Sequence, residues 1–151
     1  MTDPSPFDEA AFLGLARTAK RDPYRLSLFA QHLEAKERPL VVLPIQAGTL
    51  IVTDRRILEL RVHLEVHGAW NVKEFQGYAI SRAIDRAAIS DLAHSATPAT
   101  GPSGERRLED RVLLTTGNGT EEFLVSRGPA ATLSETDMLV LREAVLGAHA
   151  K

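Results

Sequence analysis

The sequence contains no cysteine. A disulfide scaffold, a thiol nucleophile and a thiolate metal site are therefore excluded. No apolar run reaches the length of about 18 residues that a membrane-spanning helix needs. Aromatic residues make up 5% of the chain and the formal net charge is −2, so the composition gives no general attraction to nucleic acid.

The N-terminus also lacks the basic residues that begin a signal peptide. Its first residues, MTDPS, carry the negative charge of Asp3, and we therefore expect a cytoplasmic protein. Of the 151 residues, 44% are hydrophobic and 25% are charged, which is ordinary for a folded single domain. Such a chain is long enough to bury a core without a disulfide or a metal ion.

The most regular pattern predicts a β-hairpin over residues 49–67. Apolar and polar residues alternate without interruption over residues 58–67, as a strand with one buried and one solvated face requires. The predicted core face is Leu58, Leu60, Val62, Leu64 and Val66, and the predicted wet face is Glu59, Arg61, His63, Glu65 and His67. We place the turn at residues 53–56 and expect the Asp54 side chain to cap it by accepting backbone hydrogen bonds.

Residues 48–58, GTLIVTDRRIL, resemble a signature of bacterial pleckstrin-homology-like (PH-like) domains, G-x-L-x-x-T-D-R-R followed by two hydrophobic residues. The residues that carry the resemblance are Gly48, Thr53, Asp54, Arg55 and Arg56. It covers roughly residues 40–149. The resemblance implies a mainly β fold, with a seven-stranded, strongly bent sheet or partly open barrel that a C-terminal helix closes at one end. It implies a binding module and no enzyme.

Two helices are predicted before this domain. The first, over residues 5–19, begins with a capping box that has proline at the first helical position. The second, over residues 22–35, begins in the same way at Asp22–Pro23 and carries an apolar stripe. We predict that residues 1–38 form a helical extension and residues 39–151 the PH-like domain, as one cooperative unit.

The second half of the chain predicts more strands and a last helix. Beyond the hairpin, strands are predicted at residues 40–45, within 68–80, at 111–116 and at 121–126. Residues 84–94 resemble the segment of PH-like domains that leads into the fifth strand. Residues 95–104, rich in small, polar and breaker residues, are predicted to form a loop. The last helix begins with a capping box at Ser134 and Asp137. Its predicted buried stripe is Met138, Leu141, Val145 and Ala148.

Four basic residues gather at the joint between the two predicted N-terminal helices. They are Arg17, Lys20, Arg21 and Arg25. One interpretation is a site for an anion or an acidic partner. The other, which we favour, is a solvated helix terminus, because cations stabilise the negative end of the first helix's dipole.

A metal site and a catalytic site both lack support. His63, Glu65 and His67 share one face of the predicted strand, but the outer two histidines would lie about 13 Å apart. That is too far for one ion that binds nitrogen at about 2.0–2.1 Å. The glycines at residues 117–119 precede a strand rather than a helix, so no helix N-terminus receives a phosphate. No nucleophile elbow or paired-carboxylate motif is present. We predict neither a metal, a cofactor nor an enzyme.

Two functions remain open. The first, which we favour, is a binding module that acts through protein contacts and self-association, since exposed strand edges pair readily. The PH-like resemblance also implies a tendency to form homo-oligomers. The second is binding of an anion, either a phospholipid headgroup or nucleic-acid phosphate, through arginines. These are Arg55, Arg56, Arg82, Arg86, Arg106, Arg107 and Arg111.

The second function is disfavoured by two observations. Acidic residues interleave with the arginines, so we expect local ion pairs rather than a free positive surface. The connection between the first two predicted strands, residues 46–48, contains no basic residue. We therefore expect binding neither to phosphoinositide membranes nor to nucleic acid.

Overall fold

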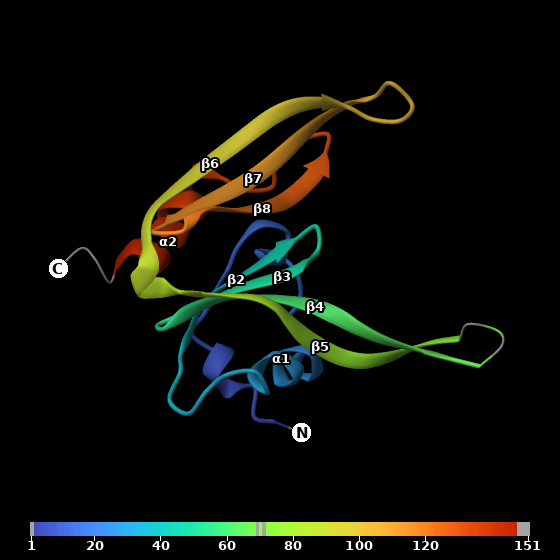
Figure 1. Cartoon of the computed structure of the whole chain (residues 1–151), viewed down its shortest axis with the longest axis vertical. Coiled ribbons are helices and arrows are strands. Elements are labelled where there is room, and N and C mark those ends of the chain that lie inside the picture. The colour runs from blue at the N-terminus through green and yellow to red at the C-terminus, as the bar shows by residue number, and fades with distance from the viewer. Residues whose placement is uncertain (1, 69, 71, 148–151) are drawn as a thin grey trace.

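Two β-sheets and a C-terminal helix make up most of the structure, a computed structural model that describes residues 2–68, 70 and 72–147 (Figure 1). The strands are β1 (Ala11–Phe12), β2 (Pro39–Ile45), β3 (Gly48–Thr53), β4 (Arg56–His67), β5 (Val72–Asp85), β6 (Ile89–Thr100), β7 (Arg106–Thr116) and β8 (Gly119–Gly128). The α-helices are α1 (Pro23–Ala30) and α2 (Glu135–Leu146), and short 3-10 turns are η1 (Ser5–Phe7), η2 (Gly14–Ala16) and η3 (Arg86–Ala88). The first sheet has the order β1-β2-β3-β4-β5 and the second the order β6-β7-β8.

The predicted mainly β class with a C-terminal helix is confirmed. The seven strands predicted from the sequence correspond to β2 through β8, divided between two hydrogen-bonded sheets, and β1 is an additional short strand. The backbone amide of Gln46, after β2, donates to the carbonyl of Leu124 in β8 at 2.9 Å. This bond ties the end of the first sheet to the outer strand of the second.

The first sheet is covered on both faces, which gives the molecule two cores. On the inner face, Leu43 packs with Phe123 of the second sheet and with α2. On the outer face, Phe7 and Phe29 of the N-terminal segment, residues 2–38, pack in a second core against β2, β3 and β4. In Figure 1 α1 and the second sheet accordingly lie on opposite sides of the first sheet, whereas Leu13 of the N-terminal segment belongs to the inner core. Because both faces are covered, β2 and β3 are apolar along most of their length rather than alternating.

The predicted first helix, residues 5–19, is wrong. The chain there forms η1 and η2 with β1 between them, and β1 pairs in parallel with β2. Leu13 is extended and Gly14 has a left-handed φ of +62°, a combination that interrupts a helix. Pairing with β2 lets Phe7 enter the outer core and Leu13 the inner core, so tertiary contacts override the local helical pattern.

The second predicted helix is confirmed at its start but is shorter than predicted. The Asp22 side chain accepts a hydrogen bond from the Tyr24 amide at 3.0 Å, and Pro23 occupies the first turn. The helix ends at Ala30 rather than near residue 35. The chain then turns back toward β2 through Lys36, whose φ is +66°.

The strands β4 and β5 form a long ribbon whose outer half extends beyond both cores (Figure 1). Leu58 and Leu60 are fully buried at its base. Val62, Leu64 and Val66, on the same face, are 47 to 56% exposed. The predicted core face is therefore a core face only at the base of the ribbon.

The loop predicted over residues 95–104 is wrong for most of its length. The strand β6 continues to Thr100 and pairs with β7, which leaves a tight turn at residues 101–105. Pro98 lies within β6 and cannot donate a ladder hydrogen bond. It is tolerated there because β6 is an edge strand of its sheet.

The C-terminal helix follows the prediction. Ser134 and Asp137 form the predicted capping box, in which the Ser134 hydroxyl accepts a hydrogen bond from the Asp137 amide at 3.0 Å. The stripe packs onto the inner core through Met138, Leu141 and Val145. Its predicted fourth member, Ala148, lies outside the described residues. In the described part of the chain, no helix combines the length and the hydropathy needed to cross a membrane.

Candidate functional site

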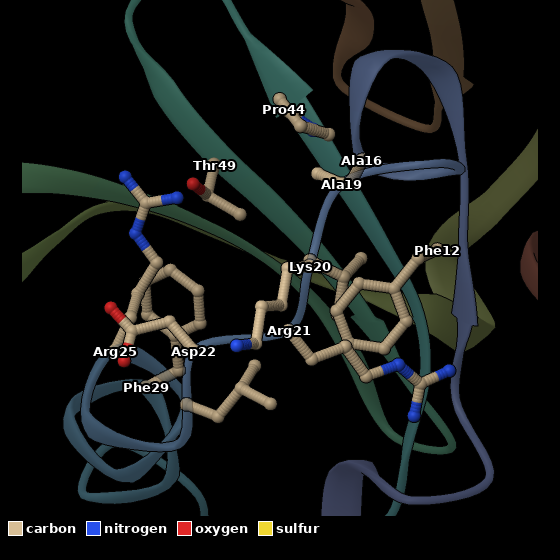
Figure 2. A pocket seen from close by; sticks show the side chains of 12 residues that line it. Phe12, Ala16, Ala19, Lys20, Arg21, Asp22, Arg25, Phe29, Pro44 and Thr49 are labelled. Atoms are coloured by element: carbon tan, nitrogen blue, oxygen red, sulfur yellow. The ribbon is translucent and has the colours of Figure 1, made fainter.

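A small pocket opens on the outer face of the first sheet, between residues 12–22, the helix α1 and the strands β2 and β3 (Figure 2). Its apolar lining includes Phe12, Leu26, Phe29, Val42 and Pro44. Its polar lining is Lys20, Arg21, Asp22, Arg25 and Thr49. The volume of the pocket is about 70 Å³, well above the roughly 10–15 Å³ that one water molecule needs. The pocket therefore has room for one small polar group over an apolar base.

Arg21 forms one wall of the pocket. Its guanidinium donates to the carbonyl oxygens of Asp8 at 3.1 Å and of Ala10 at 3.4 Å. It also lies 4.1 Å from the centre of the Phe12 ring, within the range of a cation–π contact. Because backbone carbonyls take up its donors, Arg21 fixes the wall and has little left to offer a ligand.

Lys20 and Arg25 are the cations that the pocket leaves open to a ligand. Among the residues that the structure describes, the Lys20 ammonium has no hydrogen bond or ion pair, and the Arg25 guanidinium has one hydrogen bond, from Nε to the Tyr78 hydroxyl at 3.1 Å. The Asp22 carboxylate caps α1 and offsets part of their charge. Three cations against one carboxylate give the pocket lining a net charge of +2, whereas the whole chain carries −2.

Arg17, the fourth member of the predicted basic cluster, lies elsewhere. It forms an ion pair with Asp137 at the start of α2. Burial alone would raise the pKa of Asp137, but hydrogen bonds from Arg17 and from two backbone amides, with the Arg17 charge, hold that pKa below its ordinary value. The cluster is thus divided, and Arg17 ties the N-terminal segment to the C-terminal helix. Since no first helix forms, the interpretation as cations at its dipole end is wrong.

The signature residues organise the first hairpin, but not as predicted. The Thr53 hydroxyl accepts hydrogen bonds from the amides of Arg55 at 3.1 Å and Arg56 at 3.0 Å. Thr53 therefore caps the turn, and the prediction that Asp54 caps it is wrong. The Asp54 carboxylate instead accepts a hydrogen bond from the Arg38 amide at 2.9 Å, which fixes the chain just before β2.

Thr53 and Arg56 also bind a buried carboxylate. Glu37, only 4% exposed, accepts hydrogen bonds from the Thr53 hydroxyl at 2.6 Å and from two nitrogens of Arg56, each at 2.9 Å. Burial alone would raise the pKa of Glu37, but the hydrogen bonds from Arg56 and Thr53 and the Arg56 charge lower that pKa below its ordinary value. This network joins the N-terminal segment to the first hairpin, so both signature residues have a structural role.

Gly48 and Arg55 complete the signature. A Cβ at position 48 would collide with the backbone carbonyl of Leu60, so the close approach of β3 and β4 requires glycine. The side chain of Arg55 is exposed and has no hydrogen bond or ion pair within the described residues. Its carbonyl accepts a hydrogen bond from the Arg86 amide at 3.0 Å, which links the turn to η3.

The weak metal candidates lie on the protruding ribbon. His63 and Glu65 are exposed on β4, whereas the side chain of His67 lies outside what the structure describes. Across residues 2–68, 70 and 72–147, no group of three His, Asp or Glu side chains is placed to hold a metal ion.

Most arginines of the anion-binding hypothesis are engaged within the protein. Besides Arg56, the closest pairs are Arg82–Glu59 at 2.7 Å, Arg107–Glu105 at 2.6 Å and Arg111–Glu122 at 2.6 Å. Arg86 donates to the Ala144 carbonyl in α2 at 2.8 Å. The expected pairing with interleaved acids is confirmed for Arg107 with Glu105 and for Arg111 with Glu109 at 3.0 Å. Glu59 and Glu122, which also pair with arginines, lie outside the interleaved set.

Glu59 is an exception to the predicted wet face of the hairpin. It is only 1% exposed, although His63 and Glu65 on the same strand are exposed. Burial alone would raise the pKa of Glu59, but hydrogen bonds from Arg82 and Ser81 and the nearby arginine charges lower that pKa. A buried carboxylate is kept here because Arg82 supplies its counter-charge, which the strand pattern alone does not reveal.

The outer half of the ribbon carries an apolar face that the sequence pattern predicted as core. We call Val62, Leu64, Val66 and Phe75 the ribbon face; they are 43 to 56% exposed. Leu64 lies directly opposite Phe75 in the register of β4 and β5. The Phe75 ring meets the Tyr78 ring at 5.5 Å, and Tyr78 in turn meets Phe29 of α1 at 4.8 Å. The ribbon face therefore continues the outer core beyond the part of the sheet that the N-terminal segment covers.

Comparison with known proteins adds no relative. Neither a protein-family model, nor a curated protein, nor a solved structure matches this chain.

Proposed function

We propose that this chain is a non-enzymatic binding module of the PH-like type that acts through protein contacts and pairs with a second copy of itself. Support for the PH-like assignment comes from the order of elements. The strands β2 to β5 form one antiparallel meander, β6 to β8 form another, and α2 follows. The signature residues of the first hairpin agree with this assignment.

The observation that carries the protein-contact proposal is the exposure of the ribbon face. Its four residues are 43 to 56% exposed. With about 150–250 Å² for a large aromatic side chain, Phe75 alone leaves on the order of 80 Å² in water, and the three aliphatic side chains, which are exposed to a similar fraction, extend this surface. Exposed apolar patches of a few hundred Å² mark interaction surfaces. Burial would stabilise a complex by about 25 cal/mol per Å² of apolar area.

A second copy is the partner that suits this face best. In a two-fold contact the same surface serves on both sides, and a row of aliphatic and aromatic side chains packs well against an identical row. The opposite side of the ribbon carries Arg61, His63 and Glu65, which are exposed and would remain in water. The strand β5 is also the last strand of its sheet, so a neighbour can approach the ribbon without displacing any part of the chain.

Binding to nucleic acid or to a phosphoinositide membrane is the weaker proposal. Electrostatic binding to a phosphate polymer depends on how many phosphates the protein neutralises. Arg82, Arg107 and Arg111 already pair with acids at 2.6 to 2.7 Å, so they contribute little free charge. We propose neither activity, and we propose no cofactor and no catalysis.

Light scattering behind a sizing column, at near-physiological salt, tests the proposal. We expect the wild-type chain to give about twice its 16.5 kDa mass at high concentration. Leu64→Glu places a charge on the ribbon face and should give a monomer, because a buried unpaired charge is costly. His63→Glu introduces the same side chain at the preceding residue, which lies on the opposite face of the strand. This variant should have the same measured mass as the wild type. A wild-type monomer at every concentration would refute the pairing.

A further inference from the structure

We infer that the pocket between residues 12–22, α1 and the first sheet binds a carboxylate attached to a short apolar chain. The pocket is lined by β2 and β3, through Val42, Pro44 and Thr49. The ribbon face belongs to β4 and β5. The inference therefore concerns residues other than those of the proposed pairing and goes beyond it.

The charge of the pocket selects an anion. The terminal nitrogens of Arg25 and the ammonium of Lys20 have no partner within the described residues. Figure 2 shows the Arg25 guanidinium beside the Thr49 side chain, while Lys20 projects into the space between Phe29 and Phe12. The two nitrogens of a guanidinium match the two oxygens of a carboxylate, and the ammonium adds a second charge-assisted hydrogen bond.

The small number of free donors and the apolar lining favour a carboxylate over other anions. A phosphate ester presents more oxygens and more charge, and the free donors here are one guanidinium, one ammonium and one hydroxyl. The apolar lining, including Phe12, Leu26 and Phe29, matches a hydrocarbon chain next to the charged group. A volume of about 70 Å³ admits only a short chain, so a longer ligand would extend out of the pocket.

Two sources supply this chemistry. One is a free short-chain carboxylic acid, and the other is the C-terminal carboxylate of a peptide that ends in an apolar residue. Both place a carboxylate between Lys20 and Arg25 with carbon against the aromatic lining. They differ in whether groups outside the pocket add affinity.

Amide chemical shifts of the full chain, followed during titration at near-physiological salt, test the inference. The probes are butyrate, inorganic phosphate, and the tripeptide Gly-Gly-Val as the free acid and as the amide. We expect saturable shifts around residues 20–25 with butyrate and with the free-acid peptide. Tighter binding of the peptide acid than of butyrate, with no response to its amide, assigns the site to a chain terminus. Equal or tighter binding of butyrate assigns it to a free carboxylic acid.

Two variants and a control locate the site. Arg25→Gln and Lys20→Gln should each weaken binding by about tenfold, the effect of losing one charge-assisted hydrogen bond. Lys20 has no partner within the described residues, so its variant keeps the fold. Arg55→Gln removes an exposed arginine outside the pocket and should leave the affinity for both carboxylates at the wild-type value. The inference is overturned by the absence of saturable shifts with both carboxylates, by tighter binding of phosphate, or by wild-type affinity in both pocket variants.

Discussion

Replacing Arg56 by methionine should destabilise the protein by leaving a buried carboxylate without its counter-charge. The Glu37 side chain is fully buried against an Arg56 side chain that is 20% exposed, with two hydrogen bonds at 2.9 Å. Removing one partner of a buried ion pair costs about 3–5 kcal/mol. Because Arg56 is partly solvated, we expect the lower end, about 3 kcal/mol. For a chain of this size that corresponds to a melting temperature roughly 6–12 °C lower.

The pH dependence of this loss is specific to the ion pair. Folding lowers the pKa of Glu37, so in the wild type the carboxylate adds stability above its unfolded pKa of about 4.3. That contribution is lost as the pH falls through the lower folded pKa. In Arg56→Met the counter-charge is gone and burial raises the pKa of Glu37. Protonation of Glu37 in mild acid therefore removes the buried charge and reduces the loss of stability. The difference in unfolding free energy should be largest at neutral pH and should shrink as the pH falls toward about 4.

Urea unfolding followed by circular dichroism, across this pH range, measures the effect. Arg55→Met is the matched control, because Arg55 is exposed and its side chain has no partner among the described residues. Its free energy of unfolding should stay within about 0.5 kcal/mol of the wild-type value. The reasoning is refuted if Arg56→Met is as stable as this control, or if its deficit is the same at every pH.

Two further predictions concern the corrected features of the fold. Thr53→Val removes the hydroxyl that bonds two turn amides and Glu37, and should lower the free energy of unfolding by about 2 kcal/mol. Asp54→Ala loses one hydrogen bond from the Arg38 amide and should lower it by about 1 kcal/mol. Urea unfolding measures both values, and a larger loss in Asp54→Ala would contradict the assignment of Thr53 as the cap. Limited proteolysis between residues 95 and 105 should cut only in the turn after Thr100, because β6 is paired with β7 up to that residue. Early cuts at residues 95–99, mapped by mass spectrometry, would instead support the loop predicted from the sequence.

The sequence pattern predicts an element well where local signals and tertiary contacts favour the same structure. The hairpin of β3 and β4, the pair β7 and β8 and the capping box of α2 all follow local signals that tertiary contacts reinforce. The first helix fails because pairing of β1 with β2 and burial of Phe7 outweigh a helical pattern. The loop over residues 95–104 fails because an edge strand tolerates the small residues and Pro98 that otherwise indicate a loop.

The candidate sites were less accessible to sequence reasoning. The basic cluster near residue 20 is visible in the sequence, but only the structure separates Arg17 from the pocket residues and shows Arg21 occupied by backbone carbonyls. The ribbon face is visible as alternation, yet alternation cannot tell whether anything covers the apolar side. Leu60 and Val62 occupy equivalent positions in the pattern, but Leu60 is buried in the outer core beside the N-terminal segment and Val62 is 50% exposed.

Contacts between copies across the ribbon face are the most direct test of the central proposal. Isotope-filtered nuclear Overhauser spectra, recorded on a mixture of labelled and unlabelled chains, report only contacts between two molecules. We predict such contacts between the methyl groups of Val62, Leu64 and Val66 in one copy and the Phe75 ring in the other. Intermolecular contacts confined to other surfaces, or none at a concentration where the chain self-associates, would contradict the proposal.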